Sequence, residues 1–337
     1  MKQLVITRHG PPDVLQVREA PDPTPGPDEV RIRVRAAGLN FADLLARQGL
    51  YPDAPPLPCV VGYEVAGEVD ELGDGVDSLR RGDRVIGVTR FRGQASMAVT
   101  RAERVFPLPS DWSFEAGAAL PVNYLTAHHM LARVAAVGRG ETVLVHSGGG
   151  GVGLAVAELG KILGIRVIAL ASAWKHPVLR EYGVEPLDGR DPRWWEAVRR
   201  VAPDGVDVVI DGVGGDSWRR GYALLAPAGR LICFGVSGLS SGLSRNLLAT
   251  LWRVLRYPRF APIPLMNHNR AVAGVNLGHF WNAERVLWPQ FADLLRYAHE
   301  GRIRPRVDRA FSLAEGPAAH RHLHQRGNLG KVVLLPE

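Results

Sequence analysis

Two patterns of apolar and polar residues divide the chain near residue 122. Before this point, short stretches alternate apolar and polar positions, as in "EVRIRVRAAGLN" at 29–40, where valine and isoleucine alternate with arginine. Such alternation is typical of a strand with one solvated face. Turn sequences such as "GDG" at 73–75 separate the stretches. This part of the chain predicts a compact, β-barrel-like domain with few helices.

After residue 122, the apolar runs are almost unbroken and alternate with helical patterns. The runs are "TVLVHS", "RVIALA", "VDVVID" and "RLICFG", and their composition is that of strands buried on both faces of a parallel sheet. Between the first two, the apolar residues of "GLAVAELGKILG" recur near helical spacing. Strand alternating with helix predicts a doubly wound α/β domain.

Residues 237–270 interrupt this alternation. The stretch "NLLATLWRVLRYPRFAPIPL" is apolar, basic and helix-like, and it ends in prolines. We expect it to form an insertion that lies on the α/β domain. After it, "AVAGVNLGHF" predicts a last buried strand, "AERVLWPQFADLLRYAHEG" a helix, and "KVVLLP" a closing strand that returns to the first domain. The predicted domains are 1–122 with 271–337, and 123–270 with its insertion at 237–270.

Composition adds limits to this picture. A chain of 337 residues with 46% apolar residues fits two globular domains, and no apolar run approaches a membrane span. The N-terminal segment indicates a first β-strand and not a signal peptide. Although the net charge is +7, the basic residues are scattered, so we expect no nucleic-acid partner. The two cysteines, Cys59 and Cys233, are far apart in apolar contexts, which favours reduced thiols in a cytoplasmic protein.

A glycine-rich turn lies between the first buried strand and its helix. In "HSGGGGVGLAV", Gly148, Gly150 and Gly153 have the G-x-G-x-x-G spacing. The first glycine permits a tight turn, the second lets the backbone approach a pyrophosphate, and the third lets the helix pack close to the strand. The start of the helix then offers unpaired N–H groups to phosphates. The turn predicts a dinucleotide phosphate site, with a merely flexible turn as the alternative.

The end of the next strand indicates which dinucleotide binds. Ser172 stands nineteen residues after Gly153, where an NAD-binding protein usually places an acid, and Lys175 follows it. A hydroxyl and an ammonium favour a 2′-phosphate, whereas a carboxylate would repel it. We therefore predict NADP. The alternative is that Lys175 is a solvated lysine at a helix start.

Ordered motifs over nearly the whole chain resemble one enzyme family. They are "GLNFADLLARQGLYP", "VVGYEVAGEV", "GDRV", "NYLTAHHML", "VLVHSGGGGVG" and "GKVVLLP". Together they are similar to the zinc-free quinone oxidoreductases (zeta-crystallin-like) of the medium-chain dehydrogenase/reductase superfamily. The segments "VNYLTA", "ASAWKH", "SRNLLA" and "NRAVAGVNLGHF" look most like the branch that contains vesicle amine transport protein and its bacterial relatives.

The resemblance implies a GroES-like β-rich catalytic domain built from both chain ends, and a Rossmann domain. It also implies NADPH bound in the cleft between them, reduction of a quinone or an α,β-unsaturated ketone, and a homodimer. Zinc-dependent relatives carry a cysteine where this chain has Asn40 and a histidine where it has Tyr63. Two cysteines also cannot supply a four-cysteine zinc loop, so we expect no metal. An activated alkene or quinone needs no Lewis acid, because delocalisation spreads the developing charge.

The resemblance also assigns residues. Asn40 and Tyr51 are the predicted catalytic residues, although Asn40 could only cap a helix and Tyr51 could only pack. Thr126 is expected at the nicotinamide and Arg326 at the 2′-phosphate. The full set of predicted cofactor-binding residues is Asn40, Thr126, Gly148, Gly150, Gly151, Val152, Gly153, Ser172, Lys175, Val213, Phe234, Gly235, Val236, Asn276, Gly278 and Arg326.

The chain departs from the family at two positions. Leu45 stands where some bacterial quinone reductases have a second tyrosine, and Gly189 replaces a tyrosine near the adenosine phosphate. The first departure casts doubt on quinone as the preferred substrate. Five histidines could suggest a metal site, but we expect them on solvated helix faces. They are His128, His129, His320, His322 and His324.

Other functions remain open at this point. The same fold and hydride serve reductases of enoyl thioesters and alkenals. A chiefly non-catalytic lipid or membrane-interface binding protein is the third hypothesis, although membrane contact is not the expectation. The segment 247–257 could pack on the α/β domain or across a dimer, form a mobile lid over the nicotinamide cleft, or lie at a membrane surface.

Overall fold

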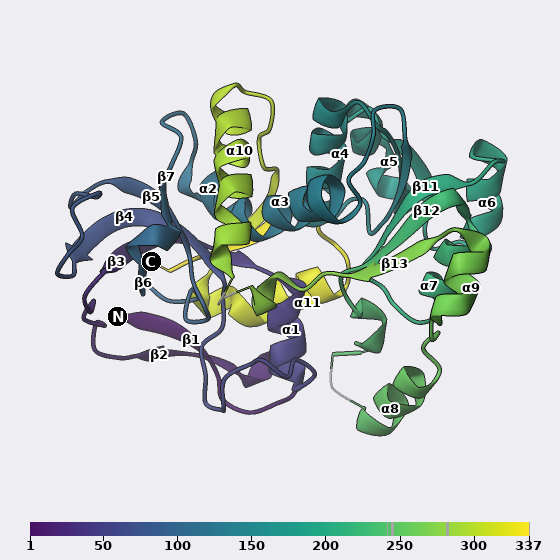
Figure 1. Cartoon of the computed structure of the whole chain (residues 1–337). Helices are drawn as coiled ribbons and strands as arrows, with labels where there is room; N and C mark the ends of the chain where they lie inside the picture. The colour runs from purple at the N-terminus through teal and green to yellow at the C-terminus, as the bar shows by residue number, and fades with distance from the viewer. Residues whose placement is uncertain (241, 244–245, 281–282, 337) are drawn as a thin grey trace. The chain divides into compact units, whose positions relative to one another are not determined.

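A computed structural model describes residues 1–240, 242–243, 246–280 and 283–336 (Figure 1). The chain forms two compact units. The first comprises Met1–Val122, Gly242–Arg245 and Arg304–Glu337, and the second comprises Asn123–Ser241 and Asn246–Ile303.

The first unit is built on a mixed seven-stranded sheet. Its strand order is β14-β15-β3-β4-β5-β7, and β6 also pairs with β3. The strands are β3 (Glu29–Leu39), β4 (Glu64–Leu72), β5 (Arg84–Val88), β6 (Met97–Arg101), β7 (Val105–Pro107), β14 (Val307–Ser312) and β15 (Lys331–Leu335). A separate hairpin pairs β1 (Lys2–Ile6) with β2 (Leu15–Glu19). The helices are α1 (Phe41–Gln48), α2 (Phe114–Ala119) and α11 (Gly316–His324), with short 3₁₀ turns at Pro12–Val14, Ala102–Arg104 and Leu313–Glu315.

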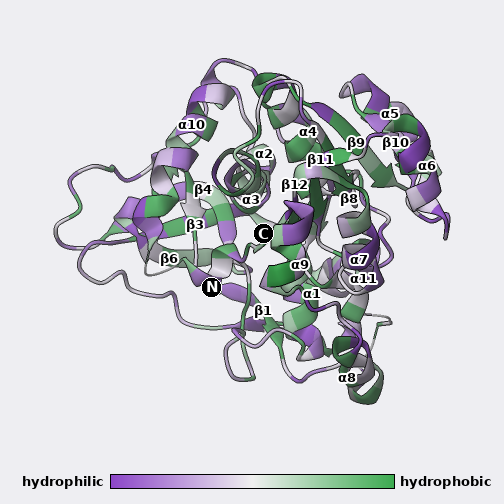
Figure 2. Ribbon diagram, turned by 45° about the vertical axis from the view of Figure 1, so that its right-hand side comes forward, coloured by the Kyte–Doolittle hydropathy of each residue, from purple (hydrophilic) through white to green (hydrophobic). Residues whose placement is uncertain are grey.

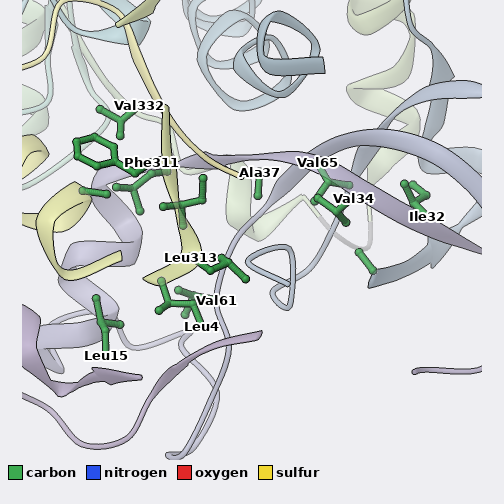
Figure 3. Packing of buried hydrophobic residues seen from close by; sticks show 14 of the residues in the cluster. Leu4, Leu15, Ile32, Val34, Ala37, Val61, Val65, Phe311, Leu313 and Val332 are labelled. Atoms are coloured by element: carbon green, nitrogen blue, oxygen red, sulfur yellow. The ribbon is translucent and has the colours of Figure 1, made fainter. Parts of the chain in front are cut away.

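The alternating pattern explains the core of this unit. Val30, Ile32 and Val34 of β3 are almost fully buried, while Arg31 and Arg33 between them pair with Asp70 of β4. Figure 3 shows side chains of β3, β4 and the C-terminal strands packed in the same apolar cluster. The closing strand β15 lies between β14 and β3, so the two ends of the chain meet in one sheet.

The second unit is built on a parallel six-stranded sheet. Its order is β10-β9-β8-β11-β12-β13. The strands are β8 (Thr142–His146), β9 (Arg166–Ala171), β10 (Glu185–Asp188), β11 (Val206–Asp211), β12 (Leu225–Cys233) and β13 (Ala271–Gly274). From β8 the chain adds β9 and β10 on one side of the sheet, and it then adds β11, β12 and β13 on the other side of β8. The carboxyl ends of β8 and β11 therefore form the point where ligands of doubly wound sheets bind.

Helices cover both faces of this sheet. Figure 1 shows α4 and α5 on one side of the strands and α7 and α9 on the other. The α-helices are α3 (Pro121–His128), α4 (Gly151–Leu163), α5 (His176–Glu181), α6 (Trp194–Val201), α7 (Asp216–Ala223), α8 (Leu247–Leu255), α9 (Pro262–His268) and α10 (Trp288–His299). A π-helical turn covers His129–Val134, and 3₁₀ turns cover Ala173–Lys175, Ser237–Leu239, Leu277–His279 and Glu284–Val286.

The predicted domain boundary at residue 271 differs from the structure. Residues 271–303 lie in the second unit, because β13 extends its sheet beside β12 and Gln290 of α10 hydrogen-bonds His128. Only the chain from Arg304 onward returns to the first unit. The prediction of a last buried strand is also wrong in one respect: β13 is a sheet edge, and none of its residues is buried.

The insertion forms helices α8 and α9, in agreement with its helical pattern. The segment after α8 packs on the α/β domain, where Tyr257 contacts Trp218 and Phe260 contacts Tyr222. The apolar face of α8, however, is not covered by the described part of the chain. Leu248, Leu251, Trp252 and Leu255 of α8 are 55–82% exposed. Figure 2 shows α8 as a largely hydrophobic helix. The expectation that this face packs on the α/β domain is therefore wrong. No helix in the described ranges combines the length and apolarity that a bilayer crossing requires.

Candidate active site

The glycine-rich turn has the geometry that its spacing predicts. It runs from the end of β8 into α4, which begins at Gly151. A Cβ on Gly148 would lie 2.5 Å from the Cβ of Ala169, and a Cβ on Gly153 would lie 2.5 Å from the Gly148 Cα. A side chain on Gly151 would overlap the amide of Asn123. Packing alone therefore requires a glycine at positions 148 and 153, whereas a side chain at position 151 would have to displace the Asn123 amide.

Gly150 is different. A Cβ at this position would meet only the Ser147 carbonyl oxygen, at 3.2 Å, and its backbone is extended with no positive φ. Packing does not demand a glycine here. Gly150 lies at the start of the thirteen-residue helix α4. The close approach of a phosphate to the backbone would explain why a glycine stands here.

The end of β9 places Ser172 and Lys175 one turn apart. Ser172 is partly exposed and precedes the 3₁₀ turn that contains Lys175. Lys175 is only 6% exposed, and its Nζ lies 5.0 Å from the ring centroid of Trp174, which is 53% exposed. The alternative of a solvated lysine is therefore wrong. Sequence reasoning gave no role to Trp174, although an exposed indole beside a lysine is unusual.

Gly189, at the position of the family tyrosine, lies against the end of β9. Its N–H donates to the carbonyl of Ala171, and a Cβ would lie 3.2 Å from Leu170. A larger residue would therefore have to point away from β9 or displace it.

One acidic side chain, Asp211, and one imidazole, His146, were not predicted from the sequence. They lie at the carboxyl ends of β11 and β8, where the strand order of the sheet changes direction. Asp211 ends β11, is fully buried, and accepts hydrogen bonds from the N–H groups of Val213 (2.6 Å) and Gly214 (3.2 Å). His146 ends β8, and its Nε2 lies 3.5 Å from Asp211 Oδ2. Burial and the Asp211 charge raise the pKa of the Cys233 thiol on the adjacent strand to about 12. The sequence does carry a signal for both residues, because each is a polar residue at the end of an otherwise apolar strand.

The remaining predicted residues of this unit gather near the same strand ends. Backbone hydrogen bonds join the Gly212–Val213 segment to Ser237 and Gly238, just after Phe234–Val236. Asn276 follows β13, and its Oδ1 accepts from Gly278 N at 3.0 Å. Thr126 is buried in α3, three residues from the Asn123 that contacts Gly151. The structure thus brings these residues together near the carboxyl ends of the strands.

In the first unit, Asn40 belongs to a buried charged cluster. Lys331 Nζ lies 2.6 Å from Asn40 Oδ1 and 2.5 Å from Glu64 Oε1, and Asn40 Nδ2 donates to Glu64 Oε1 at 2.9 Å. The other Glu64 oxygen accepts from Val122 N at 2.7 Å. A side chain at Gly38 would overlap the Glu64 carboxylate, so a glycine in β3 makes room for the cluster. We name Asn40, Glu64 and Lys331 the Asn40 cluster.

Asp43 lies beside this cluster in α1. It is fully buried, and its Oδ2 accepts from the Asn40 N–H at 2.8 Å. Burial raises the pKa of Asp43 to about 7, and the Glu64 charge adds to the rise while Lys331 opposes it. Asp43 can therefore be neutral at physiological pH.

Two tyrosines accompany the cluster. The rings of Tyr51 and Tyr63 are 6.4 Å apart and nearly perpendicular, and Phe91 packs on Tyr63. Burial raises the pKa of both phenols, so both remain protonated donors near neutral pH. Asn40 thus lies between the Lys331 ammonium and the Glu64 carboxylate, and Tyr63 lies beside Tyr51 and Phe91. Within the described ranges, no cluster of three or more histidine, cysteine or acidic side chains could hold a metal ion.

The remaining predicted positions are more peripheral. Arg326 is exposed in a left-handed turn after α11, with φ of 57°. Leu45 is buried in α1.

The expectation of solvated histidines is wrong for His128, His129 and His320, which are all buried. Gln290 hydrogen-bonds the first two, and burial beside Arg47 lowers the pKa of His320 to about 3.

Known proteins match the whole chain. A family described as alcohol dehydrogenase GroES-like domain matches residues 26–110, and one described as zinc-binding dehydrogenase matches residues 183–334. The rat synaptic vesicle membrane protein VAT-1 homolog is 38% identical over 100% of this chain and 84% of its own length. A quinone oxidoreductase of Pseudomonas aeruginosa is 34% identical over 99% of both chains.

The chain belongs to the zinc-free quinone oxidoreductase-like family of the medium-chain dehydrogenase/reductase superfamily. Solved structures of this superfamily share its fold. A mycobacterial protein complexed with NADPH is 33% identical with a TM-score of 0.86, and both chains are covered completely. The Escherichia coli quinone oxidoreductase complexed with NADPH is 28% identical with a TM-score of 0.86, again over both whole chains. CurK enoyl reductase is 28% identical over 99% of this chain and 98% of its own, with a TM-score of 0.85.

Family membership accounts for the GroES-like and Rossmann units predicted from the sequence. It identifies the chain as a member of an oxidoreductase family that acts on small molecules.

Proposed function

We propose that this protein is a zinc-independent, NADPH-dependent reductase that transfers hydride to a quinone or an α,β-unsaturated carbonyl compound. The observation that carries the proposal is the Asn40 cluster. Its amide, that of Asn40, stands where the zinc-dependent relatives have a cysteine, and the Lys331 ammonium lies directly beside it. Because Lys331 Nζ lies 2.6 Å from Asn40 Oδ1, a divalent cation at this amide oxygen would be repelled.

The second unit fits NADPH. The start of α4 offers N–H groups to the pyrophosphate beside the side-chain-free Gly150, and Ser172 and Lys175 provide a hydroxyl and an ammonium for the 2′-phosphate. Two similar structures contain NADPH, which supports the assignment. Bound NADPH supplies the hydride. The loops after β11, β12 and β13 would hold the nicotinamide end, with Thr126 beside them.

The first unit would supply hydrogen-bond donors. Asn40 Nδ2 has two hydrogens, one of which serves Glu64. The other can donate to the substrate oxygen as negative charge develops there. Tyr51, protonated near neutral pH, can deliver a proton or a hydrogen bond. Such donors suffice for an enone or quinone, because the charge is delocalised.

The test combines binding with turnover. NADPH should bind at least tenfold more tightly than NADH, on the order of 1.4 kcal/mol, because Ser172 and Lys175 favour the 2′-phosphate. Lys175→Ala should erode this preference, while Lys161→Ala, at an exposed lysine, should not. NADPH oxidation should appear with quinones or enones and should persist in the presence of chelators. Equal affinity for both cofactors would refute the cofactor assignment, and turnover that needs added zinc would refute the proposed mechanism.

The acceptor panel also separates the alternatives. It should include alkenals and enoyl thioesters, because CurK enoyl reductase has a similar fold. If enoyl thioesters are reduced far faster than quinones and enones, the reductase assignment stands but its substrate class changes. We further propose that the protein is a homodimer and that it lies in the cytoplasm, a location consistent with the free thiols of Cys59 and Cys233.

The exposed face of α8 favours a second candidate function, binding to an anionic lipid surface. Five of its described apolar residues are exposed, and four of them, Leu248, Leu251, Trp252 and Leu255, recur at helical spacing. Arg256 stacks on Trp252 with its Cζ 3.4 Å from the ring centroid, and Arg253 binds the carbonyl of Gly238. An apolar face flanked by arginines is typical of a helix that lies in a membrane interface.

Vesicle flotation tests this second candidate. Wild-type protein should float with phosphatidylserine-containing vesicles, and Leu251→Asp/Leu255→Asp should not, because the charges would enter the apolar layer. Val17→Asp, at another exposed apolar residue, is the matched control. If the double variant instead splits a dimer, seen by size-exclusion chromatography, the face is a subunit interface. If neither property changes, the face has neither role.

A further inference from the structure

The use of lysine in this chain is selective. Only four of its 41 basic residues are lysines, at positions 2, 161, 175 and 331. Lys2 and Lys161 are exposed, whereas Lys175 and Lys331 are 6% and 3% exposed. A lysine presents one compact ammonium, and an arginine presents a larger planar fork. The two buried lysines therefore lie where a compact cation is needed.

Lys331 fixes the orientation of the Asn40 amide. An ammonium can only donate and a carboxylate can only accept. Because Lys331 Nζ faces Oδ1 and Glu64 faces Nδ2, the amide has one possible orientation. The three groups form a closed ring, since Lys331 also pairs with Glu64. The Val122 N–H holds the second carboxylate oxygen and prevents its rotation.

The ring also changes the strength of the amide as a donor. A cation at Oδ1 draws electron density from the amide group and makes the remaining N–H a better donor. The effect is large in a buried site, where the effective dielectric constant is low. Within the Asn40 cluster, the positive charge of Lys331 is paired with the negative charge of Glu64. The amide is thus polarised without an unpaired ion beside it.

We propose that Lys331 is a positioning residue that orients and polarises Asn40, so that a buried ammonium on the last strand does the electrostatic work that a metal does in zinc-dependent relatives. This inference rests on the proposed function. Lys331 does not itself touch the substrate in this scheme. It acts through Asn40, whose free N–H would stabilise the negative charge that develops on the acceptor oxygen.

The experiment must separate catalysis from folding. Lys331→Met alone would leave Glu64 buried and unpaired, which is destabilising. The informative variant is Lys331→Met/Glu64→Gln, because it removes both charges together: the glutamine oxygen can still accept from Val122 N, and its NH2 group can donate to Asn40 Oδ1 once Lys331 is gone. Lys161→Met is the matched control for loss of a lysine. For each protein we would measure NADPH affinity by fluorescence titration, kcat and KM for the best acceptor, and the side-chain spectrum of ¹⁵N-asparagine-labelled protein, with Asn40 assigned from Asn40→Ser.

The double variant should bind NADPH within about twofold of the wild type, because most of the predicted cofactor-binding residues lie in the second unit and neither Lys331 nor Glu64 is among them. Its kcat should fall about 100-fold, as for loss of one well-placed donor, and the Asn40 amide signals should move toward those of exposed asparagines. A folded double variant with kcat within threefold of the wild type, or with unchanged Asn40 signals, would overturn the inference. A wild-type protein that reduces no acceptor would instead defeat the proposed function, and the Asn40 spectrum would still decide whether Lys331 fixes the amide.

Discussion

Asp43→Asn should raise the free energy of unfolding above that of the wild type. The gain should be about 4 kcal/mol larger at pH 8 than at pH 4. In the folded wild type, burial raises the pKa of Asp43 from 3.8 to about 7. The folded state therefore binds this proton more tightly than the unfolded state does. The stability that the neutral carboxyl contributes is present below pH 4 and is lost as the pH rises through 7. Asparagine mimics the neutral form at every pH.

Urea unfolding of both proteins across this pH range measures the effect. The amide oxygen of the new asparagine can still accept from the Asn40 N–H, so the start of α1 is preserved. Asp77→Asn, at an exposed carboxylate, is the control and should leave the pH profile unchanged. Parallel profiles for Asp43→Asn and the wild type would show that Asp43 ionises without cost in the folded protein.

Gly153→Ala should have the second large effect, a loss of about 3 kcal/mol or more of unfolding free energy. Its Cβ would fall within 2.5 Å of the Gly148 backbone, so the phosphate turn or the start of α4 must shift. Gly150→Ala meets only one carbonyl oxygen, at 3.2 Å, and should fold nearly normally. Under the proposed function, it should nevertheless weaken NADPH binding at least tenfold, since its methyl group obstructs the approach of the pyrophosphate.

Thermal unfolding and NADPH titration of the two variants give this comparison. Gly138→Ala is the control, because its new methyl group would have only ordinary contacts, at 3.9 Å. Normal stability of Gly153→Ala would mean that α4 can move away without cost. Normal NADPH affinity of Gly150→Ala would mean that no phosphate approaches this residue.

The parts of the fold that local pattern determines were predictable. Four apolar runs became strands β8, β9, β11 and β12, and the glycine spacing became a strand–turn–helix. The reason is that a strand buried on both faces and a turn without side chains each leave a mark within a few residues. The predicted domain boundary at residue 271 was wrong because it depends on more than local pattern. The short apolar pattern of β13 indicates a strand but does not indicate which sheet it joins.

The Asn40 cluster was only partly predictable. The sequence identified Asn40 through its family motif, but "GKVVLLP" predicted only a closing strand. Lys331 became significant when the pairing of β15 with β3 placed it beside a residue 291 positions away. Buried histidines were misjudged because a polar side chain on a helix is usually solvated, and only tertiary contacts such as those of Gln290 show the exception.

The position of β15 has a consequence for how the protein is made. Residue 333 pairs with residue 38, so the sheet of the first unit lacks one of its central strands until the last residues have left the ribosome. The second unit ends at Ile303 and so emerges earlier, and its strands form a sheet of their own. We expect the second unit to fold first during synthesis, while β3 waits with one unpaired edge. Chaperones that shield exposed strand edges would therefore act on the older part of the nascent chain and not on the newer part.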